Sequence, residues 1–309
     1  MILRPQNRDE LLQQLRDNFS RGAKITSVDL SALNSIVEHS PEDMTASAGA
    51  GLTVAAFQDH LRASRQWLPI DPPHPQALSI GDLLAHDLSG CRRLGYGTIR
   101  DYLIGIKVAL ADGTLIKAGG KVVKNVAGYD LCKLFVGARH SLGVIVEATF
   151  KLRPLAEAED FVSTNISSLS ELDKLRTALL NSRTDPILFD AFSHFGQITC
   201  IAGFAGSRED VEAQTQIALA IGFQASSESK SPISLLSSFA SSRPISVLPS
   251  RTIATLEQLR PTDFLVHLGN GIIYYRGGIP SQPTQIPTAL MNRVKNAYDP
   301  KKIFPEYTA

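Results

Sequence analysis

The stretch from Gly95 to Pro154 constrains the fold more than any other part of the sequence. Its centre runs from Gly119 to Asp130, and it contains three glycine-bearing turns separated by apolar runs typical of strands. Glycine lets bare backbone approach a flat or phosphorylated ligand closely. A packed core alone has little need of such turns, so the stretch predicts a ligand-binding region.

A β-hairpin is predicted inside this stretch, from Tyr102 to Lys117. Ile106 and Val108 alternate with Lys107 and a small residue, and Asp112-Gly113 supplies a tight turn. This is the clearest strand pairing that the sequence encodes.

The chain has 309 residues, which is long enough for two domains. A β-branched strand expected from Leu142 to Leu152 is followed by Pro154, and we place the end of the first domain there, giving residues 1–154. Residues 155–309 alternate helices with paired strands, a pattern typical of an antiparallel sheet with helices on one side. The predicted fold class is α+β.

Composition argues against several classes of function. The net charge is +1, so the sequence gives no electrostatic reason to expect nucleic acid or an anionic membrane as a partner. Cys91, Cys132 and Cys200 have no paired spacing, which predicts no metal site and reduced thiols in a cytoplasmic protein. No apolar run approaches the ~20 residues that span a bilayer, and the first residues lack the pattern of a signal peptide.

Familiar nucleotide-binding and hydrolase motifs are missing. No Gly-x-Gly-x-x-Gly follows a strand, which disfavours a Rossmann site, and there is neither a phosphate-binding P-loop nor a Gly-x-Ser-x-Gly elbow. The histidines are isolated in the sequence, and no catalytic residue is assigned. Arg92 and Arg93 are open to two interpretations: they face an acidic ligand, or they are solvated on a loop.

Several segments taken together resemble the FAD-binding domain of the vanillyl-alcohol oxidase and p-cresol methylhydroxylase (PCMH-type) superfamily. Within it they are similar to the FAD-binding subunits of bacterial glycolate oxidase. The resemblance is dense from Ala48 to Pro154 and returns close to the end of the sequence, at Asp299-Pro300 and Phe304-Pro305. The segments that carry it are Gly49–Thr53, Leu68–Pro75, Ser89–Arg93, Tyr96–Asp101, Lys121–Asp130 and Leu142–Ile145.

The resemblance implies a PCMH-type FAD-binding domain of two small α/β subdomains, followed by an antiparallel cap domain. The last segment is expected to pack back on the first domain. The resemblance also implies that these segments wrap an extended FAD. The implied cofactor contacts are Pro72, Ser89, Gly90, Gly97, Thr98, Asp101, Lys124, Asn125, Gly128, Tyr129, Val144 and Ile145.

The sequence departs from the family pattern where the cofactor diphosphate binds. The family has a glycine-rich loop near its N-terminus, because a diphosphate needs several converging N–H donors. Here only Gly22 precedes Gly49, and Arg21–Lys24 is at best a stub of that loop. Most of the loop is therefore missing from this chain.

Two further departures affect the same anionic part of the cofactor. A glycine pair is expected after Ile80, but the second position is Asp82, a carboxylate where backbone would approach the diphosphate. In the family's Gly-Ser-Glu-Gly-Thr-Leu-Gly motif, Arg139 and His140 replace the glutamate and the central glycine.

Two functions follow from the resemblance. In the first, the chain is the FAD-binding subunit of a glycolate-oxidase-like complex that oxidises a small 2-hydroxy acid and passes electrons through flavin. Its implied partners are a paralogous flavoprotein subunit, to which we assign most of the oxidation chemistry, and an iron–sulfur subunit. These partners would hold a cytoplasmic chain at the membrane periphery. In the second, the chain is a flavin-free structural or docking subunit that keeps the fold.

Overall fold

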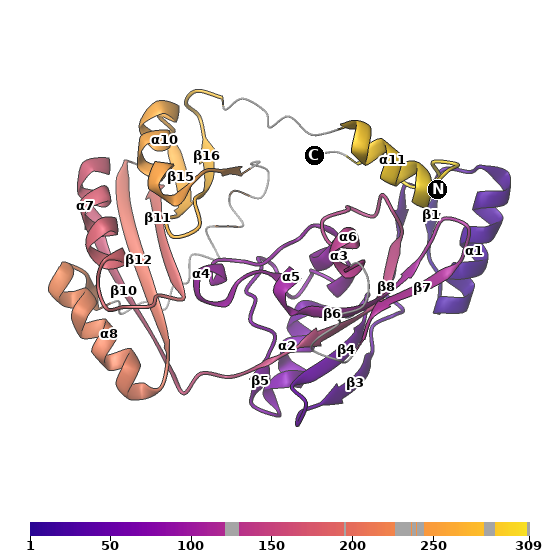
Figure 1. Ribbon diagram of the computed structural model, residues 1–309, viewed down its shortest axis with the longest axis horizontal. Helices are drawn as coiled ribbons and strands as arrows, with labels where there is room; N and C mark the ends of the chain where they lie inside the picture. Colours follow the sequence, from indigo (N-terminus) through magenta and orange to yellow (C-terminus); the bar gives the residue numbers. More distant parts are fainter. Residues whose placement is uncertain are drawn as a thin grey trace.

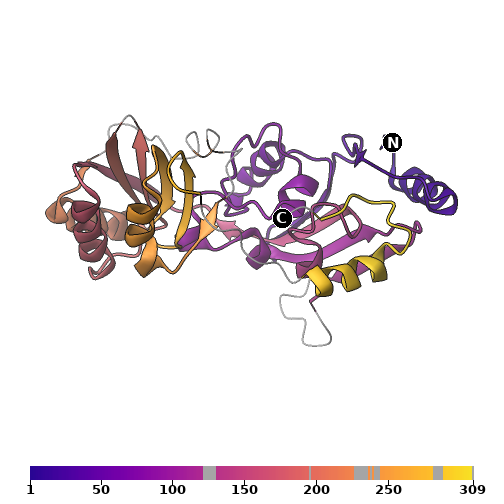
Figure 2. The ribbon, with the colours of Figure 1, turned by 90° about the horizontal axis from the view of Figure 1, so that it is seen from above.

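The computed structural model describes residues 1–120, 130–194, 196–225, 236, 239, 244–280 and 288–307. They form two lobes, each built around its own sheet, with the segment before β10 (Ala158–Ile166) connecting them (Figure 1). Seen from above, the lobes lie next to each other along the long axis of the molecule (Figure 2). The last helix, α11 (Thr288–Tyr298), lies on the first lobe.

The first lobe is organised around a five-stranded sheet in the order β3-β4-β8-β6-β7, in which all neighbouring strands are antiparallel. Two two-stranded sheets, β1-β2 and β5-β9, flank it. The elements of this lobe are β1 (Ile2–Leu3), α1 (Arg8–Arg21), β2 (Ser27–Val28), β3 (Ile36–Ser40), β4 (Thr45–Gly49), α2 (Val54–Arg62), β5 (Gln66–Trp67), α3 (Ile80–Ala85), α4 (Arg93–Tyr96), α5 (Ile99–Tyr102), β6 (Leu103–Ala109), β7 (Leu115–Gly119), α6 (Cys132–Phe135), β8 (Val144–Lys151) and β9 (Arg153–Pro154).

The predicted hairpin is confirmed as β6 and β7. Ile106 and Val108 are buried, and Gly113 has φ +76°, a conformation that favours glycine in the tight turn. The side chain of Asp112 accepts a hydrogen bond from Thr114 N at 2.8 Å, which closes the turn. Alternation and turn chemistry therefore determine this pairing locally.

The second lobe is a seven-stranded antiparallel sheet in the order β13-β10-β12-β11-β15-β16-β14. Helices α7, α8 and α10 pack against one face of it (Figure 1). Besides β10, its elements are α7 (Leu169–Leu180), β11 (Leu188–His194), β12 (Gln197–Gly206), α8 (Arg208–Ile221), β13 (Gln224–Ala225), β14 (Ile245–Ser246), the 3-10 helix η1 (Pro249–Arg251), α10 (Thr252–Leu259), β15 (Asp263–His267) and β16 (Ile272–Arg276).

The sequence pattern did not predict strand β10. Only Val162 and Ile166 of its nine residues are buried, so its apolar alternation is weak. It is held instead by a long register with β12, from Ala158 opposite Gly206 to Ile166 opposite Ile198. Tertiary pairing rather than local pattern makes this segment a strand.

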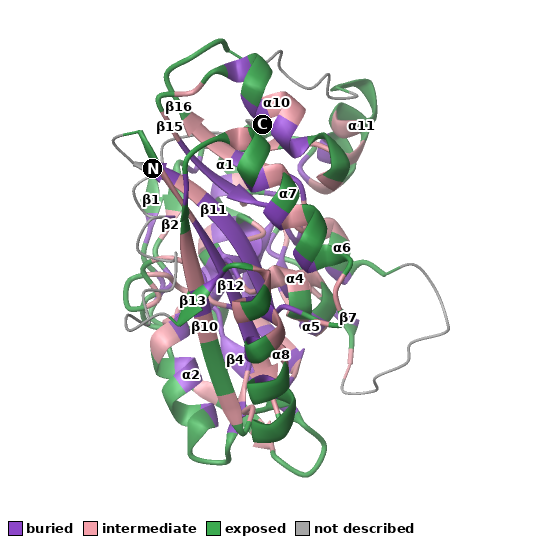
Figure 3. Ribbon diagram, turned by 90° about the vertical axis from the view of Figure 1, so that its left-hand side faces the viewer, coloured by how far each residue is buried: buried purple, intermediate pink, exposed green. Residues whose placement is uncertain are grey.

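The central strands of the second sheet are covered on both faces. Five consecutive residues of β12, Cys200–Phe204, are buried, as expected when neither face meets water. In Figure 3 these strands are buried, whereas α7 and α8 turn exposed surfaces outward. The helices cover one face, and part of the first lobe around Cys91 packs on the other. We propose the domain boundary at Pro154 because the two sheets have separate cores, the first built from residues up to Leu152 with Ile303 and Phe304 added, the second from residues after Pro154.

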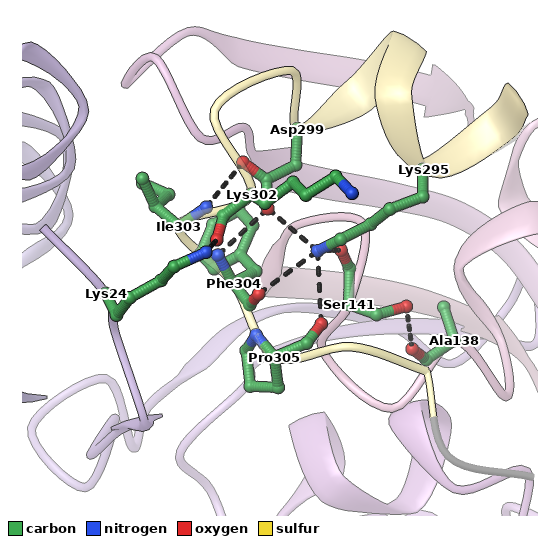
Figure 4. Close-up of polar contacts among 9 residues, drawn as sticks. All are labelled: Lys24, Ala138, Ser141, Lys295, Asp299, Lys302, Ile303, Phe304 and Pro305. Carbon is green, nitrogen blue, oxygen red and sulfur yellow. Dashed lines mark hydrogen bonds and ion pairs between the residues drawn. The ribbon is translucent and has the colours of Figure 1, made fainter. Parts of the chain in front are cut away.

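The C-terminal segment is fastened to the first lobe by a buried lysine (Figure 4). Lys295 Nζ donates to Asp299 Oδ2 at 2.7 Å and to the carbonyl of Ser141 at 2.7 Å, and the carbonyls of Phe304 and Pro305 lie at 3.2 and 3.1 Å. The side chains of Lys295 and Asp299 are 7% and 0% exposed. The ion pair therefore links α11, the final turn and the loop before β8.

The final turn is also built around Asp299. Its two carboxylate oxygens accept hydrogen bonds from the backbone N–H groups of Ile303 and Phe304, both at 2.9 Å. Ile25 N donates to the carbonyl of Ile303 at 2.7 Å, and both Ile303 and Phe304 belong to the core of the first lobe. The end of the described chain is thus part of that lobe.

Candidate functional site

Three of the segments predicted to contact a cofactor meet beside the lobe junction. Asp71 and Gly90 form a parallel bridge, and Asp71 N donates to the carbonyl of Ser89 at 3.1 Å. Ser89 Oγ accepts a hydrogen bond from Ile99 N at 3.0 Å. The proline run with Pro72, the Ser89-Gly90 turn and the start of α5 therefore lie together, although 10 residues separate Ser89 from Ile99 in the sequence.

Thr98 and Asp101 form a capping box at the start of α5. Asp101 Oδ2 accepts hydrogen bonds from Thr98 N at 2.7 Å and from Thr98 Oγ1 at 2.9 Å. Desolvation raises the pKa of Asp101, but these two hydrogen bonds outweigh it and the pKa is lowered. Both side chains thus have a structural partner within the chain.

The glycines at this place are explained by close packing. Gly97 has φ +86°, and a Cβ built on it lies 2.7 Å from Asp101 Oδ2. Gly90 has φ +88°, and a Cβ there lies 2.1 Å from the carbonyl oxygen of Asp71. Both positions require glycine, because a Cβ would prevent the close backbone approach. They show no space reserved for a ligand. We call the two turns, with Ser89, Gly90, Gly97 and Thr98, the turn cluster.

The remaining predicted contacts lie elsewhere. Val144 and Ile145 are buried in β8, opposite Ala109 and Val108 of β6. Both residues belong to the core of the first lobe. Four more predicted contacts lie outside the described residues: Lys124, Asn125, Gly128 and Tyr129.

Arg92 is not solvated on a loop, which was one of the two interpretations of the sequence, because carboxylates of the chain itself pair with it. Its side chain is 16% exposed, pairs with Glu159 of β10, and has its Nε 3.6 Å from Asp71 Oδ2. Its guanidinium also lies 5.7 Å from the ring centre of Trp67. Burial raises the pKa of Asp71 to about 7, against the lowering effect of Arg92. Arg92 thus joins the two lobes.

A cleft of about 500 Å³ opens next to this ion pair. Pro72, Trp67 and Arg92 line it on the first lobe, and Glu159 lines it at the start of the second. Pro72 is the one predicted cofactor contact among its lining residues. The cleft places the partly buried Arg92, the ring of Trp67 and three carboxylates, those of Asp59, Asp71 and Glu159, around one space.

The predicted stub of the phosphate loop offers no free backbone donor to the diphosphate of FAD. Gly22, the predicted stub of the phosphate loop, is the C-cap of α1: it has φ +64° and its N–H bonds back to the helix. Its backbone donor is therefore committed to the chain itself. Gly22 therefore ends a helix and does not begin a phosphate-binding loop.

The first turn of α3 already holds a carboxylate. Asp82 Oδ2 accepts from Ser79 Oγ at 2.8 Å, and Asp82 Oδ1 lies 3.1 Å from His140 Nε2. The His140 hydrogen bond and that of Ser79 lower the pKa of Asp82, against desolvation. An ionised side chain thus occupies the position where the resemblance expects backbone facing a diphosphate, and the two negative groups repel each other. At this end the residues do not fit the cofactor.

The contact between Asp82 and His140 gives a testable pH dependence. Replacing His140 with alanine removes the largest influence that lowers the pKa of Asp82, so this pKa rises toward the ordinary carboxyl range. A carboxyl with a lowered folded pKa stabilises the fold above its unfolded pKa and loses that effect as the pH falls through the folded value. Carboxyl carbon NMR shifts between acid and neutral pH measure the change, and an unaltered Asp82 titration would contradict it.

Comparison with known proteins assigns a family to the first half of the chain. Residues 16–119 match the family described as "FAD binding domain". Among proteins of known identity, the chain is 39% identical over 127 residues to glycolate oxidase subunit GlcD of Bacillus subtilis (strain 168), covering 41% of this chain and 27% of that protein. It is 33% identical over 142 residues to glycolate oxidase subunit GlcE of Escherichia coli (strain K12), covering 46% and 41%. These matches span less than half of each relative.

The fold extends over both lobes. A solved structure of alkyldihydroxyacetonephosphate synthase superposes with a TM-score of 0.74 at 13% identity, covering 98% of this chain and 76% of that one. At this identity the likeness shows the fold alone, and it confirms the predicted α+β class with a PCMH-type domain and a cap. In the part of the chain that the structure describes, no helix has the length and apolar character needed to cross a bilayer.

Proposed function

We propose that this chain is the FAD-binding subunit of a glycolate-oxidase-like complex that oxidises a small 2-hydroxy acid. The match of residues 16–119 to an FAD-binding domain carries the proposal, and the two glycolate oxidase subunits among its relatives support the reaction class. When bound, FAD supplies the hydride acceptor. The resemblance assigns the cofactor contacts of this chain to Ser89, Gly90 and Thr98 among others, and the intrachain hydrogen bonds of these residues would hold them rigidly beside it.

The division of labour in the complex is part of the proposal. We assign no catalytic residue to this chain and give the proton and hydride chemistry to a paralogous flavoprotein subunit. An iron–sulfur subunit would receive the electrons. The chain would act in the cytoplasm and reach the membrane periphery only through these partners.

A flavin-free structural or docking subunit is the second candidate. It is favoured by Asp82, whose charge occupies the turn that the diphosphate would approach, and by Gly22, whose N–H is used as a helix cap. A diphosphate without compensating donors is costly to desolvate. The fold would then be retained for packing against the partner subunits.

Flavin content separates the two candidates. The full chain is purified, gel-filtered and examined for flavin absorbance, before and after incubation with FAD. Yellow protein, or stoichiometric FAD uptake by colourless protein, is expected for the FAD-binding subunit. A folded chain that is colourless and takes up no FAD would refute the first candidate and leave the second. The same conclusion follows if a complex with a flavoprotein partner contains only the flavin of that partner.

A further inference from the structure

Three side chains of the type that ligates metals meet at the lobe junction: Cys91, Asp190 and His267. Asp190 on β11 lies directly opposite His267 on β15 in an antiparallel pair, so both side chains point to the same face of the sheet. Cys91 lies just before α4, in the part of the first lobe that covers this face. Each residue offers a ligand atom, and these atoms lie within 4.8 Å of one another.

The cluster is closed to solvent. Cys91, Asp190 and His267 are 1%, 1% and 2% exposed. His267 Nδ1 lies 2.8 Å from Asp190 Oδ1, but Asp190 Oδ2 has no hydrogen-bond partner among the described residues. His267 holds only one oxygen of this carboxylate, and leaving the other buried oxygen without a hydrogen-bond partner is unfavourable. A positively charged group next to Asp190 Oδ2 would therefore stabilise the cluster.

A divalent cation meets this need. Thiolate, imidazole and carboxylate are the ligands that zinc takes in proteins, and this mixture of soft and intermediate donors does not suit magnesium or calcium. A thiolate and a carboxylate together neutralise the two charges of the cation. The three side chains fill three of the four tetrahedral positions, and a water molecule would complete the fourth. We propose that Cys91, Asp190 and His267 bind a divalent cation of the zinc class, which fastens the first lobe to the cap sheet.

Small movements suffice for binding. Bonds of about 2.0–2.3 Å to a tetrahedral zinc hold its ligand atoms roughly 3.3–3.8 Å apart. The present separations are at most 4.8 Å. On binding, a sulfur–metal bond forms, the Cys91 thiol proton passes to solvent, and no atom changes oxidation state. Asp190 Oδ2 is the carboxylate oxygen that is open to the cation.

The surroundings hold the ligands in place. The backbone next to Cys91 is fixed by the bridge between Gly90 and Asp71, and by the hydrogen bond from Arg92 N to Asp71 Oδ1 at 3.0 Å. The ring of Tyr274 packs edge-on against His267 at 5.8 Å between ring centres. Rigid support of this kind is what a metal site needs around its ligands.

Metal content of the full chain tests the proposal. The chain is expressed with added zinc, gel-filtered in a buffer containing a mild chelator, and analysed by plasma emission spectrometry. Zinc stoichiometric with protein is expected for the wild type and for Cys200→Ser, and little zinc for Cys91→Ser and His267→Gln. Cys200 is a matched control, because it is a buried thiol on the neighbouring strand outside the cluster.

Refolding with Co²⁺ gives a second readout, since a thiolate bound to cobalt absorbs strongly in the near ultraviolet. The chain has three cysteines, so the double variant Cys132→Ser/Cys200→Ser leaves Cys91 as the only thiol. This variant is expected to keep the band even where Cys91→Ser fails to fold. A wild-type chain with neither zinc nor the band overturns the proposal. So does a folded Cys91→Ser chain with undiminished zinc.

Discussion

Replacing Lys295 with methionine is expected to lower the free energy of unfolding by about 3–5 kcal/mol, because it leaves the buried charge of Asp299 without its partner. Lys295 Nζ also holds the carbonyl of Ser141, so the substitution releases the loop before β8 as well. Chemical denaturation followed by fluorescence and circular dichroism measures the loss.

Arg293→Met is the matched control for this result. Arg293 lies on the same helix, α11, but is exposed, so its replacement should change the unfolding free energy by no more than about 0.5 kcal/mol. Equal stability of Lys295→Met and wild type would show that the C-terminal segment is not fastened by this ion pair.

Replacing Asp82 with glycine is expected to tighten FAD binding at least about tenfold, which corresponds to about 1.4 kcal/mol. The substitution removes a negative charge from the first turn of α3 and restores the backbone that the resemblance expects beside the diphosphate. Glycine inside the helix costs about 1 kcal/mol of stability. Fluorescence quenching of FAD titrated with protein measures the affinity.

Two further variants distinguish the effect of the Asp82 charge from the effect of its side-chain volume. Asp82→Asn keeps most of the side-chain volume and removes only the charge, whereas Asp112→Asn removes an equal charge from the exposed hairpin turn. Tighter binding by Asp82→Gly and Asp82→Asn, but not by Asp112→Asn, assigns the effect to the start of α3. Unchanged affinity in both Asp82 variants would mean that the diphosphate does not approach this turn.

Local signals predicted the parts of the fold that depend on neighbouring residues. The hairpin of β6 and β7 follows from the alternation around Ile106 and from Asp112-Gly113. Strand β10 escaped prediction because its few buried residues give no period, and β12 supplies the pairing.

The candidate site was predicted only in part, because glycine serves packing as readily as ligand binding. Gly90 and Gly97 were predicted as cofactor contacts, and in the structure their close contacts are with Asp71 and Asp101 of the same chain. No signal in the sequence pointed to the cluster of Cys91, Asp190 and His267 at the lobe junction. Asp190 and His267 are 77 residues apart, and Cys91 lies in a different lobe. Cysteine spacing detects sites made within one segment, and no local pattern reports a cluster assembled by strand pairing.

The return of the C-terminal segment to the first lobe has a consequence for synthesis on the ribosome. Ile303 and Phe304 belong to the core that α1 and the five-stranded sheet begin to assemble. Domains usually fold in the order in which they emerge, but here the lobe that is translated first cannot close its interior until residues 303 and 304 have also been synthesised. During that interval the nascent polypeptide would present an incomplete apolar surface, which chaperones recognise.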